Sequence, residues 1–255
     1  SLGVGLLWEA MEDKLWIGAS YQSRPNFNGE TTLEGELTNI FPPSEETNDV
    51  VLTQRLPDIY RLGARFRPVE DWEVRLFGDY TRWSAFDNQC IIGEDALDGA
   101  DAFDFCQLDG RGALANQENT IVQNLQRNWE DAFGIRLGGS YFVNDKVELM
   151  LDLGYDGNAV PDDYLEPALM DMPKWSAGVG GEFMLYQTSG FGLELATTVT
   201  GIFYNERDTN GASTADTLAV DLGEGRSDLN SVQPSSEGVY NQTIVVVNTA
   251  LNLFF

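Results

Sequence analysis

Arginine and acidic side chains recur at every second position of several segments, where they could pair with one another or hold a charged ligand. A guanidinium group binds a carboxylate through two parallel N–H donors, so Arg65, Arg75 and Arg136 are candidate anchors for an acidic head group. The alternative is a lattice of ion pairs that stiffens a protein wall. The charged residues that share this alternation are Arg61, Arg65, Glu73, Arg75, Asp79, Arg136, Glu148, Asp152, Asp156, Glu182 and Glu194.

Large apolar side chains follow the same alternation as these charges. They are Leu7, Trp16, Phe77, Phe142, Met150, Met184 and Ile202. A hydrophobic ligand needs an apolar conduit with a few polar anchors, whereas a passage for polar solutes gains nothing from such residues. We therefore predict one ligand-binding face that combines both kinds of side chain. Its candidate residues are Arg65, Arg75, Arg136, Phe77, Phe142, Met150 and Met184.

The composition excludes several classes of function. The chain has 255 residues, with 15 basic and 41 acidic, so its formal net charge is −26, and it has no histidine. Without histidine there is no Ser-His-Asp or Cys-His catalysis and no His-ligated metal site. The acidic charge argues against a nucleic-acid partner, because phosphate binding relies largely on Lys and Arg.

Two cysteines, Cys90 and Cys106, lie close together in a polar stretch of the sequence. Neither a CxxC motif nor the spacing of a zinc site is present. Such a pair fits one local disulfide in an oxidising compartment, and two free thiols are the alternative. We predict the disulfide.

The segments that carry these side chains have a hydrophobic period of two, which is typical of β-strands. About nine segments show it: 4–10, 15–21, 60–66, 71–84, 133–141, 146–156, 175–185, 193–203 and 245–255. Many are longer than the five or six residues usual in globular proteins and match the roughly 9–11 of a tilted membrane-spanning strand. The pattern predicts an all-β protein, an antiparallel transmembrane β-barrel.

Short turns and long polar connections alternate between these segments. The turns fall near 12–13, 69–71, 144–145 and 188–190, and the long connections near 40–49, 85–127, 157–172 and 206–235. Outer-membrane barrels have short periplasmic turns and long extracellular loops, so we expect 85–127 to be a long extracellular loop that holds the disulfide. Residues 14–40 should then form one kinked strand or two strand pieces in line. No apolar run approaches the ~20 residues of a transmembrane helix, and we expect no signal peptide before the first strand.

Three stretches carry a resemblance to a known family. They are GVGLLWEAMEDKLWIGASYQSR (3–24), LPDIYRLGARFRPVEDWEVRLFGDYTRW (56–83) and NWEDAFGIRLGGSYFVNDKVELMLDLGYDGNAVPDD (128–163). Together with the aromatic C-terminal strand, they resemble the FadL/OmpP1/TodX family of outer-membrane transporters of long-chain fatty acids and other hydrophobic compounds. The ordered series covers most of the chain apart from the loops.

The resemblance implies a fourteen-stranded barrel plugged by an N-terminal hatch domain. Residues 1–255 would be a single β-barrel region with the last nine strands, and the hatch and the first strands would be absent. An antiparallel barrel closed from one chain normally needs an even number of strands, so further strands are expected elsewhere. In the family an acidic residue near a lateral gate matches Asp156, which makes Asp156 a further candidate site residue.

The leading functional hypothesis is passive transport of long-chain fatty acids or other hydrophobic compounds. It implies a multi-pass protein of the cell outer membrane that is not an enzyme and uses no cofactor or metal. The expected partners are a hydrophobic small-molecule ligand, outer-membrane lipid and the barrel insertion machinery, which would read the strand that ends in Phe255. Two alternatives stay open: a porin-like protein or a homo-oligomer of partial barrels, and a surface receptor or adhesin that binds through 85–127.

Overall fold

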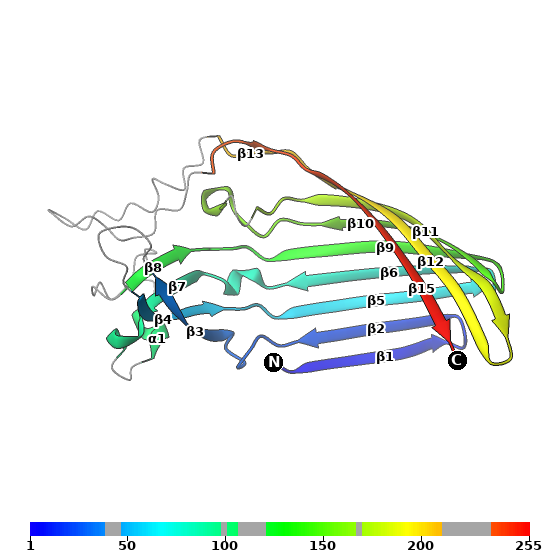
Figure 1. Ribbon diagram of the computed structural model, residues 1–255, viewed down its shortest axis with the longest axis horizontal. Coiled ribbons are helices and arrows are strands. Elements are labelled where there is room, and N and C mark those ends of the chain that lie inside the picture. The colour runs from blue at the N-terminus through cyan, green and yellow to red at the C-terminus, as the bar shows by residue number, and fades with distance from the viewer. Residues whose placement is uncertain (39–46, 98–100, 107–120, 167–169, 211–235) are drawn as a thin grey trace.

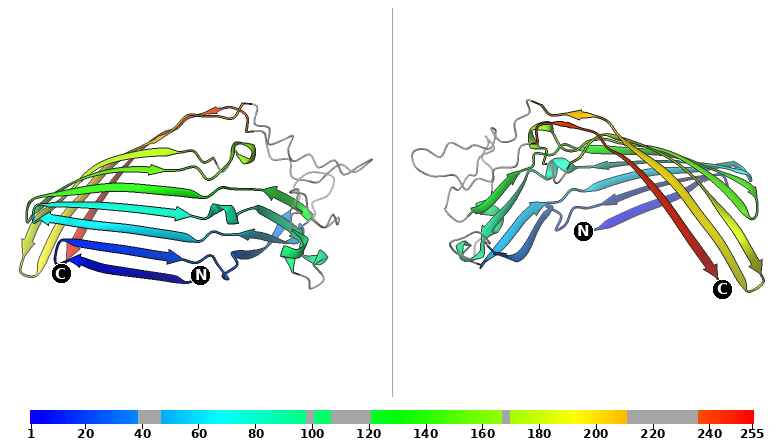
Figure 2. Two further views of the ribbon diagram at one scale, coloured as in Figure 1. Left: turned by 180° about the vertical axis from the view of Figure 1, so that it is seen from behind. Right: turned by 45° about the horizontal axis from the view of Figure 1, so that its top comes forward.

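Nine antiparallel strands form one curved sheet in the order β1-β2-β5-β6-β9-β10-β11-β12-β15 (Figures 1 and 2). The computed structural model describes residues 1–38, 47–97, 101–106, 121–166, 170–210 and 236–255. The strands of this sheet are β1 (Gly3–Met11), β2 (Leu15–Gln22), β5 (Ile59–Val69), β6 (Trp72–Thr81), β9 (Ala132–Asn144), β10 (Val147–Asp156), β11 (Lys174–Thr188), β12 (Phe191–Tyr204) and β15 (Thr243–Phe254). Strands of this length with short turns at one end are what the hydrophobic period predicts.

One side of this sheet, the outer face, is apolar and exposed. On β10 it carries Leu149, Leu151 and Leu153, which are 45%, 58% and 51% exposed. The register places Val179 of β11 and Leu137 of β9 beside them. A belt of this kind, left bare of any protein partner among the described residues, is suited to lipid rather than to water. The sheet therefore has no globular core of its own.

The opposite side, the inner face, is polar and rich in glycine. In one row of the register Arg65 of β5 is opposite Arg75 of β6, and Asp152 of β10 is opposite Gly138 and Gly178. Small residues keep this face close to the level of the backbone and leave room for long charged side chains. The alternation read from the sequence assigns both faces correctly.

A second, four-stranded sheet lies beyond the main sheet, at the end where the long connections are (Figure 1). Its order is β3-β4-β7-β8, with bounds β3 (Glu30–Thr38), β4 (Thr47–Arg55), β7 (Asn88–Gly93) and β8 (Ile121–Gln126). The hydrophobic period did not predict this sheet, and 85–127 was expected to be a long loop. The described part of the predicted stretch 14–40, residues 14–38, contains two strand pieces, β2 and β3, but the two belong to different sheets.

The disulfide between Cys90 and Cys106 is present, with a Cα–Cα distance of 6.1 Å. It joins β7 to the residue that follows the short helix α1 (Ala102–Phe105) and is part of a small buried cluster with Val51 and Ile92. The prediction of this bond is confirmed. That 85–127 is an extracellular loop stays a prediction.

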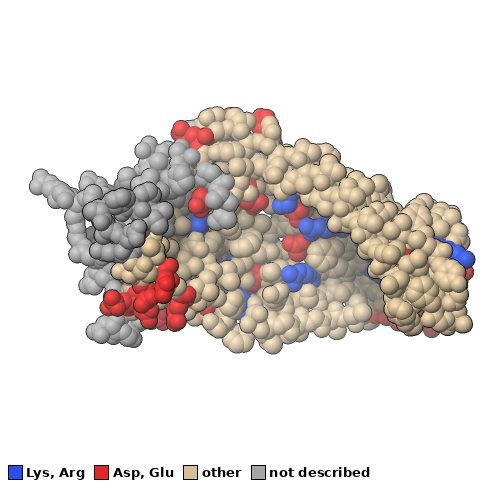
Figure 3. All heavy atoms as spheres, viewed as in Figure 1, with Lys and Arg blue, Asp and Glu red and all other residues tan. Residues whose placement is uncertain are grey.

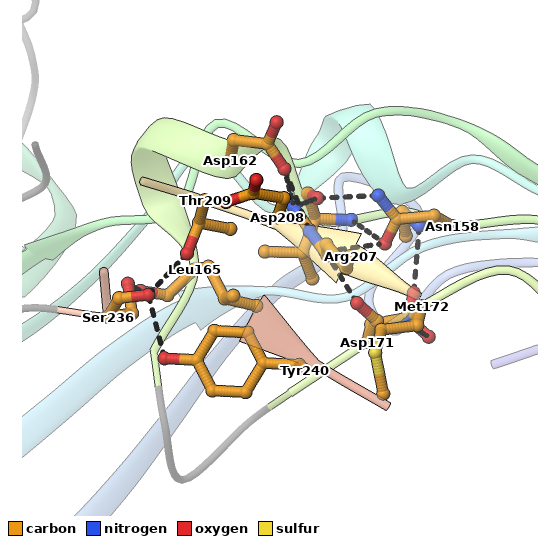
Figure 4. Close-up of polar contacts among 12 residues, drawn as sticks. Asn158, Asp162, Leu165, Asp171, Met172, Arg207, Asp208, Thr209, Ser236 and Tyr240 are labelled. Carbon is orange, nitrogen blue, oxygen red and sulfur yellow. Dashed lines mark hydrogen bonds and ion pairs between the residues drawn. The ribbon is translucent and has the colours of Figure 1, made fainter. Parts of the chain in front are cut away.

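Buried arginines tie the long connections together. Arg207, in β13 (Arg207–Asp208), is 7% exposed and ion-pairs with Asp162 at 2.7 Å. Its guanidinium also donates to the carbonyl oxygens of Val160 and Asp171 (Figure 4). The connection after β10, which includes the 3-10 turn η3 (Asp162–Tyr164), is thereby fixed to the connection after β12. The strand β14 (Val239–Tyr240) pairs with β13.

The main sheet has two open edges. β1 and β15 stand at the two ends of the strand order and do not pair with each other in the part of the chain that the structure describes. No described helix is both long and apolar enough to cross a membrane. The placement of the nine strands within a fourteen-stranded barrel stays a prediction.

The two faces predict opposite responses to a new charge. Leu151→Arg should lower the free energy of unfolding from a lipid bilayer by ~2–4 kcal/mol, because it places a cation against lipid near the midplane. Met150→Arg, on the inner face of the same strand, should cost clearly less. Urea titrations of the protein folded in bilayers would measure both. Equal losses for the two variants would contradict the assignment of the faces.

Candidate ligand-binding site on the inner face

Charged side chains gather in the hollow of the curved sheet (Figure 3). An apolar pocket of about 820 Å³ lies among them, on β1, β2, β5 and β6. Leu7, Trp16 and Phe77 provide its large inner-face side chains, and Gly18 and Gly63 form its floor. A Cβ at Gly18 would meet Leu7 at 3.7 Å, and one at Gly63 would meet Phe77 at 3.6 Å. The glycines thus keep the floor open between the larger residues.

Two of the predicted anchor residues on the rim of this pocket share one buried carboxylate within the wall. Glu73 is fully buried, and its carboxylate receives Arg65 at 2.6 Å and Arg75 at 2.5 Å. Arg75 also approaches Glu148 at 3.8 Å, and the guanidinium of Arg65 lies 5.0 Å from the ring centre of Trp16. This geometry supports the ion-pair lattice for Arg65 and Arg75. They still give the pocket a polar border.

The third predicted anchor, Arg136, belongs to a separate ion-pair network. It binds Asp79 at 3.1 Å and Asp156 at 2.7 Å, so the two carboxylates come from β6 and β10 on either side of β9. Gly134 provides the space, since a Cβ there would lie 2.8 Å from an oxygen of each carboxylate. Asp156 is thus held by Arg136 at the end of its strand.

Arg61 was on the predicted inner face but not among the candidate site residues. It lines the same pocket as Arg65 and Arg75, and it alone of these three makes no ion pair with a described residue. Its guanidinium donates a hydrogen bond to the side-chain oxygen of Gln22 at 3.4 Å. Its cross-strand neighbour Asp79 is already bound to Arg136. The sequence could not show this, because the choice of partner depends on the register.

A second, charged hollow of about 900 Å³ lies near the short turns. Phe142, Met184 and Glu182 line it, and the ligand-binding role of Phe142 and Met184 stays a prediction. The guanidinium of Arg67 stacks over Phe142 with 4.5 Å to the ring centre. Met150 is on the inner face but lines neither hollow. No three His, Cys, Asp or Glu side chains in the described ranges are grouped to hold a metal ion.

Comparison with known proteins decides the family. The model of the outer membrane protein transport protein family (OMPP1/FadL/TodX) matches residues 1–198. The chain belongs to this family. Members of the family are outer-membrane β-barrel transporters, so the predicted localisation and fold class are confirmed. A transporter family also fits the prediction that the chain is not an enzyme.

Individual relatives of this family member are distant. A long-chain fatty acid transport protein of Escherichia coli O6:H1 is 23% identical over 188 residues, 69% of this chain and 37% of that protein. The crystal structure of a Pseudomonas aeruginosa FadL homologue has a TM-score of 0.62 at 11% identity, over 98% of this chain and 50% of the other. The crystal structure of the Ralstonia pickettii toluene transporter TbuX has a TM-score of 0.52 at 13% identity, over 99% of this chain and 47% of the other. The chain thus spans half or less of the length of each.

The buried carboxylate of Glu73 makes a stability prediction. Glu73→Gln should lower the free energy of unfolding by about 1.5–3 kcal/mol, the usual contribution of hydrogen bonds to charged groups, because Arg65 and Arg75 lose their shared counter-charge. Glu194→Gln is the matched control, since Glu194 is also on the inner face but accepts a hydrogen bond from the neutral Asn252 and makes no ion pair with a described residue. Denaturant titration would measure both. A control that loses as much stability as Glu73→Gln would contradict the assignment.

Proposed function

We propose that the inner face of this wall conducts long-chain fatty acids or other hydrophobic compounds across the outer membrane by passive diffusion. The observation that carries the proposal is the apolar pocket bordered by Leu7, Trp16 and Phe77 within an otherwise polar and ion-paired face. Water-filled passages gain nothing from such a pocket, whereas a hydrophobic ligand needs apolar surface with a few polar contacts. The relatives named for fatty acid and toluene transport support the same class of substrate.

The pairing of the arginines suggests how a fatty acid would be oriented. Around the pocket, Arg65 and Arg75 share Glu73, which leaves Arg61 as the guanidinium able to pair with a carboxylate without breaking an existing ion pair. An acyl chain over the Gly18 and Gly63 floor would then have its head group at Arg61. Arg61 replaces Arg65, Arg75 and Arg136 as our proposed anchor residue.

Two further parts of the proposal concern the whole protein rather than the described wall. We propose that strands additional to the nine of the main sheet close the barrel, because unpaired backbone groups are not tolerated in lipid. Capture at the outer surface and lateral escape into the membrane belong to the proposal for the whole protein. Along the described wall, the ligand would bind first in one and then in the other of two sites, the apolar pocket and the charged hollow.

Substitution of Arg61 tests the orientation. Arg61→Gln should weaken binding of a long-chain fatty acid roughly 10-fold to 100-fold, the equivalent of one charge-assisted hydrogen-bonded contact. Binding of the matching alcohol should be unchanged. Lys174→Gln is the control, because Lys174 is in the same inner-face row but outside the pocket. Titration of the full-length protein with a fluorescent fatty acid would measure these affinities.

Substitution of Phe77 tests the pocket itself. Phe77→Ala removes apolar contact surface, so it should weaken binding of the acid and of the alcohol to a similar degree. If the Arg61→Gln variant bound the acid normally, the proposed anchor role of Arg61 would be contradicted, but the proposed role of the pocket would not. A Phe77→Ala variant that binds and takes up both ligands normally would contradict transport through this pocket.

A further inference from the structure

A groove of about 940 Å³ lies on the outer face, on the reverse side of the strands that form the apolar pocket. It crosses β1, β2, β5, β6 and β9, and its lining is almost entirely carbon. The residues along its centre form one row of the register: Leu6, Ala19, Leu62, Gly78 and Ile135. We call this surface the outer groove. Arg61 and Phe77 border both the outer groove and the apolar pocket, but the proposal below does not depend on the proposed transport function.

Small residues create the outer groove at only one part of the belt. In the same row, β10, β11 and β12 carry Tyr155, Trp175 and Phe203, with ring centres 4.8 Å apart for the first two. On β2 and β6 the row instead carries Ala19 and Gly78. Packing within the chain does not require this glycine, because a Cβ at Gly78 would meet only the carbonyl oxygen of Gly134, at 3.6 Å. The space is therefore open to an occupant from outside the protein.

Polar groups stand at one end of the outer groove. Tyr21, Tyr60 and Tyr80 line it as a ladder of rings with centres 4.9 and 6.3 Å apart. The hydroxyls of Tyr21 and Tyr60 donate to Asp58. Arg82 ion-pairs with this carboxylate at 3.2 Å through one nitrogen, while its side chain remains 40% exposed. Tyrosine and arginine at one level of a belt are typical of the boundary between hydrocarbon and head groups.

We propose that the outer groove binds one acyl chain of a phosphate-bearing membrane lipid, with the phosphate at Arg82. The apolar lining selects hydrocarbon, which surrounds this face in the membrane. The exposed guanidinium at the boundary is complementary to a phosphate, which it can bind through parallel N–H groups. Asp58 and the tyrosines hold the guanidinium at the end of the groove. The bound lipid would fill the part of the belt that the aromatic side chains fill elsewhere.

Retention of a defined lipid tests this proposal. The full-length protein in mild detergent would be titrated with phosphatidylglycerol, and bound lipid counted by native mass spectrometry. Gly78→Leu, which fills the groove, should weaken binding of the tightest lipid at least fivefold. Ala177→Leu, on the outer face of β11 away from the groove, is the matched control and should have no effect. Arg82→Gln should weaken the binding of phosphatidylglycerol but not that of diacylglycerol, which has no phosphate.

The outcomes are decisive in both directions. Wild-type affinity in Gly78→Leu, or equal loss in Ala177→Leu, would show bulk annular lipid only and overturn the proposal. If Gly78→Leu does not fold, as judged by its heat-dependent electrophoretic mobility, Ala19→Leu fills the same groove from β2 and replaces it. If Arg82→Gln weakened the binding of diacylglycerol as much as that of phosphatidylglycerol, the proposed contact between Arg82 and the lipid phosphate would be overturned. Fatty acid uptake by the inner face is expected to be unchanged in each variant.

Discussion

Lipid offers no hydrogen-bond partner to a peptide group, and this constraint governs the whole chain. Each strand of the main sheet must satisfy its backbone through its neighbours, so the sheet is continuous from β1 to β15, and only its two edge strands lack a second partner among the described residues. The same constraint orders the side chains, because a strand has only two faces. Leu149, Leu151 and Leu153 meet lipid on one of them. Everything polar must then share the other face.

Crowding charges on the inner face determines what a ligand can meet there. Glu73 is shared by Arg65 and Arg75, with Glu148 also near Arg75, and Arg136 is shared by Asp79 and Asp156, so most of the arginines on this face already have carboxylate partners. A ligand gains little from breaking such pairs, since each broken pair would leave a charge uncompensated. Apolar gaps and unpaired groups are therefore the informative places. The pocket floor of glycines beside Arg61 is the place where both occur together.

The sequence predicted those features that depend on local alternation. The two faces, the short turns and the Cys90–Cys106 bond follow from the order of residue types, and the structure contains them. The second, four-stranded sheet was not predicted, because strands such as Thr47–Arg55 contain many polar residues and lie in a long connection. That Arg61 makes no ion pair with a described residue was not predicted, because ion-pair partners come from neighbouring strands. Alternation can be recognised within one strand, whereas the register depends on how two strands pair.

The central claim is that β10 separates lipid from a sheltered interior, and accessibility along this strand tests it most directly. Single spin labels would be placed at successive positions from Val147 to Asp156 in the bilayer-inserted, full-length protein. We predict that collisions with oxygen are high at Leu149, Leu151 and Leu153 and that collisions with a water-soluble nickel reagent are high at the positions between them. Uniform accessibility, or nickel access at the three leucines, would contradict the account.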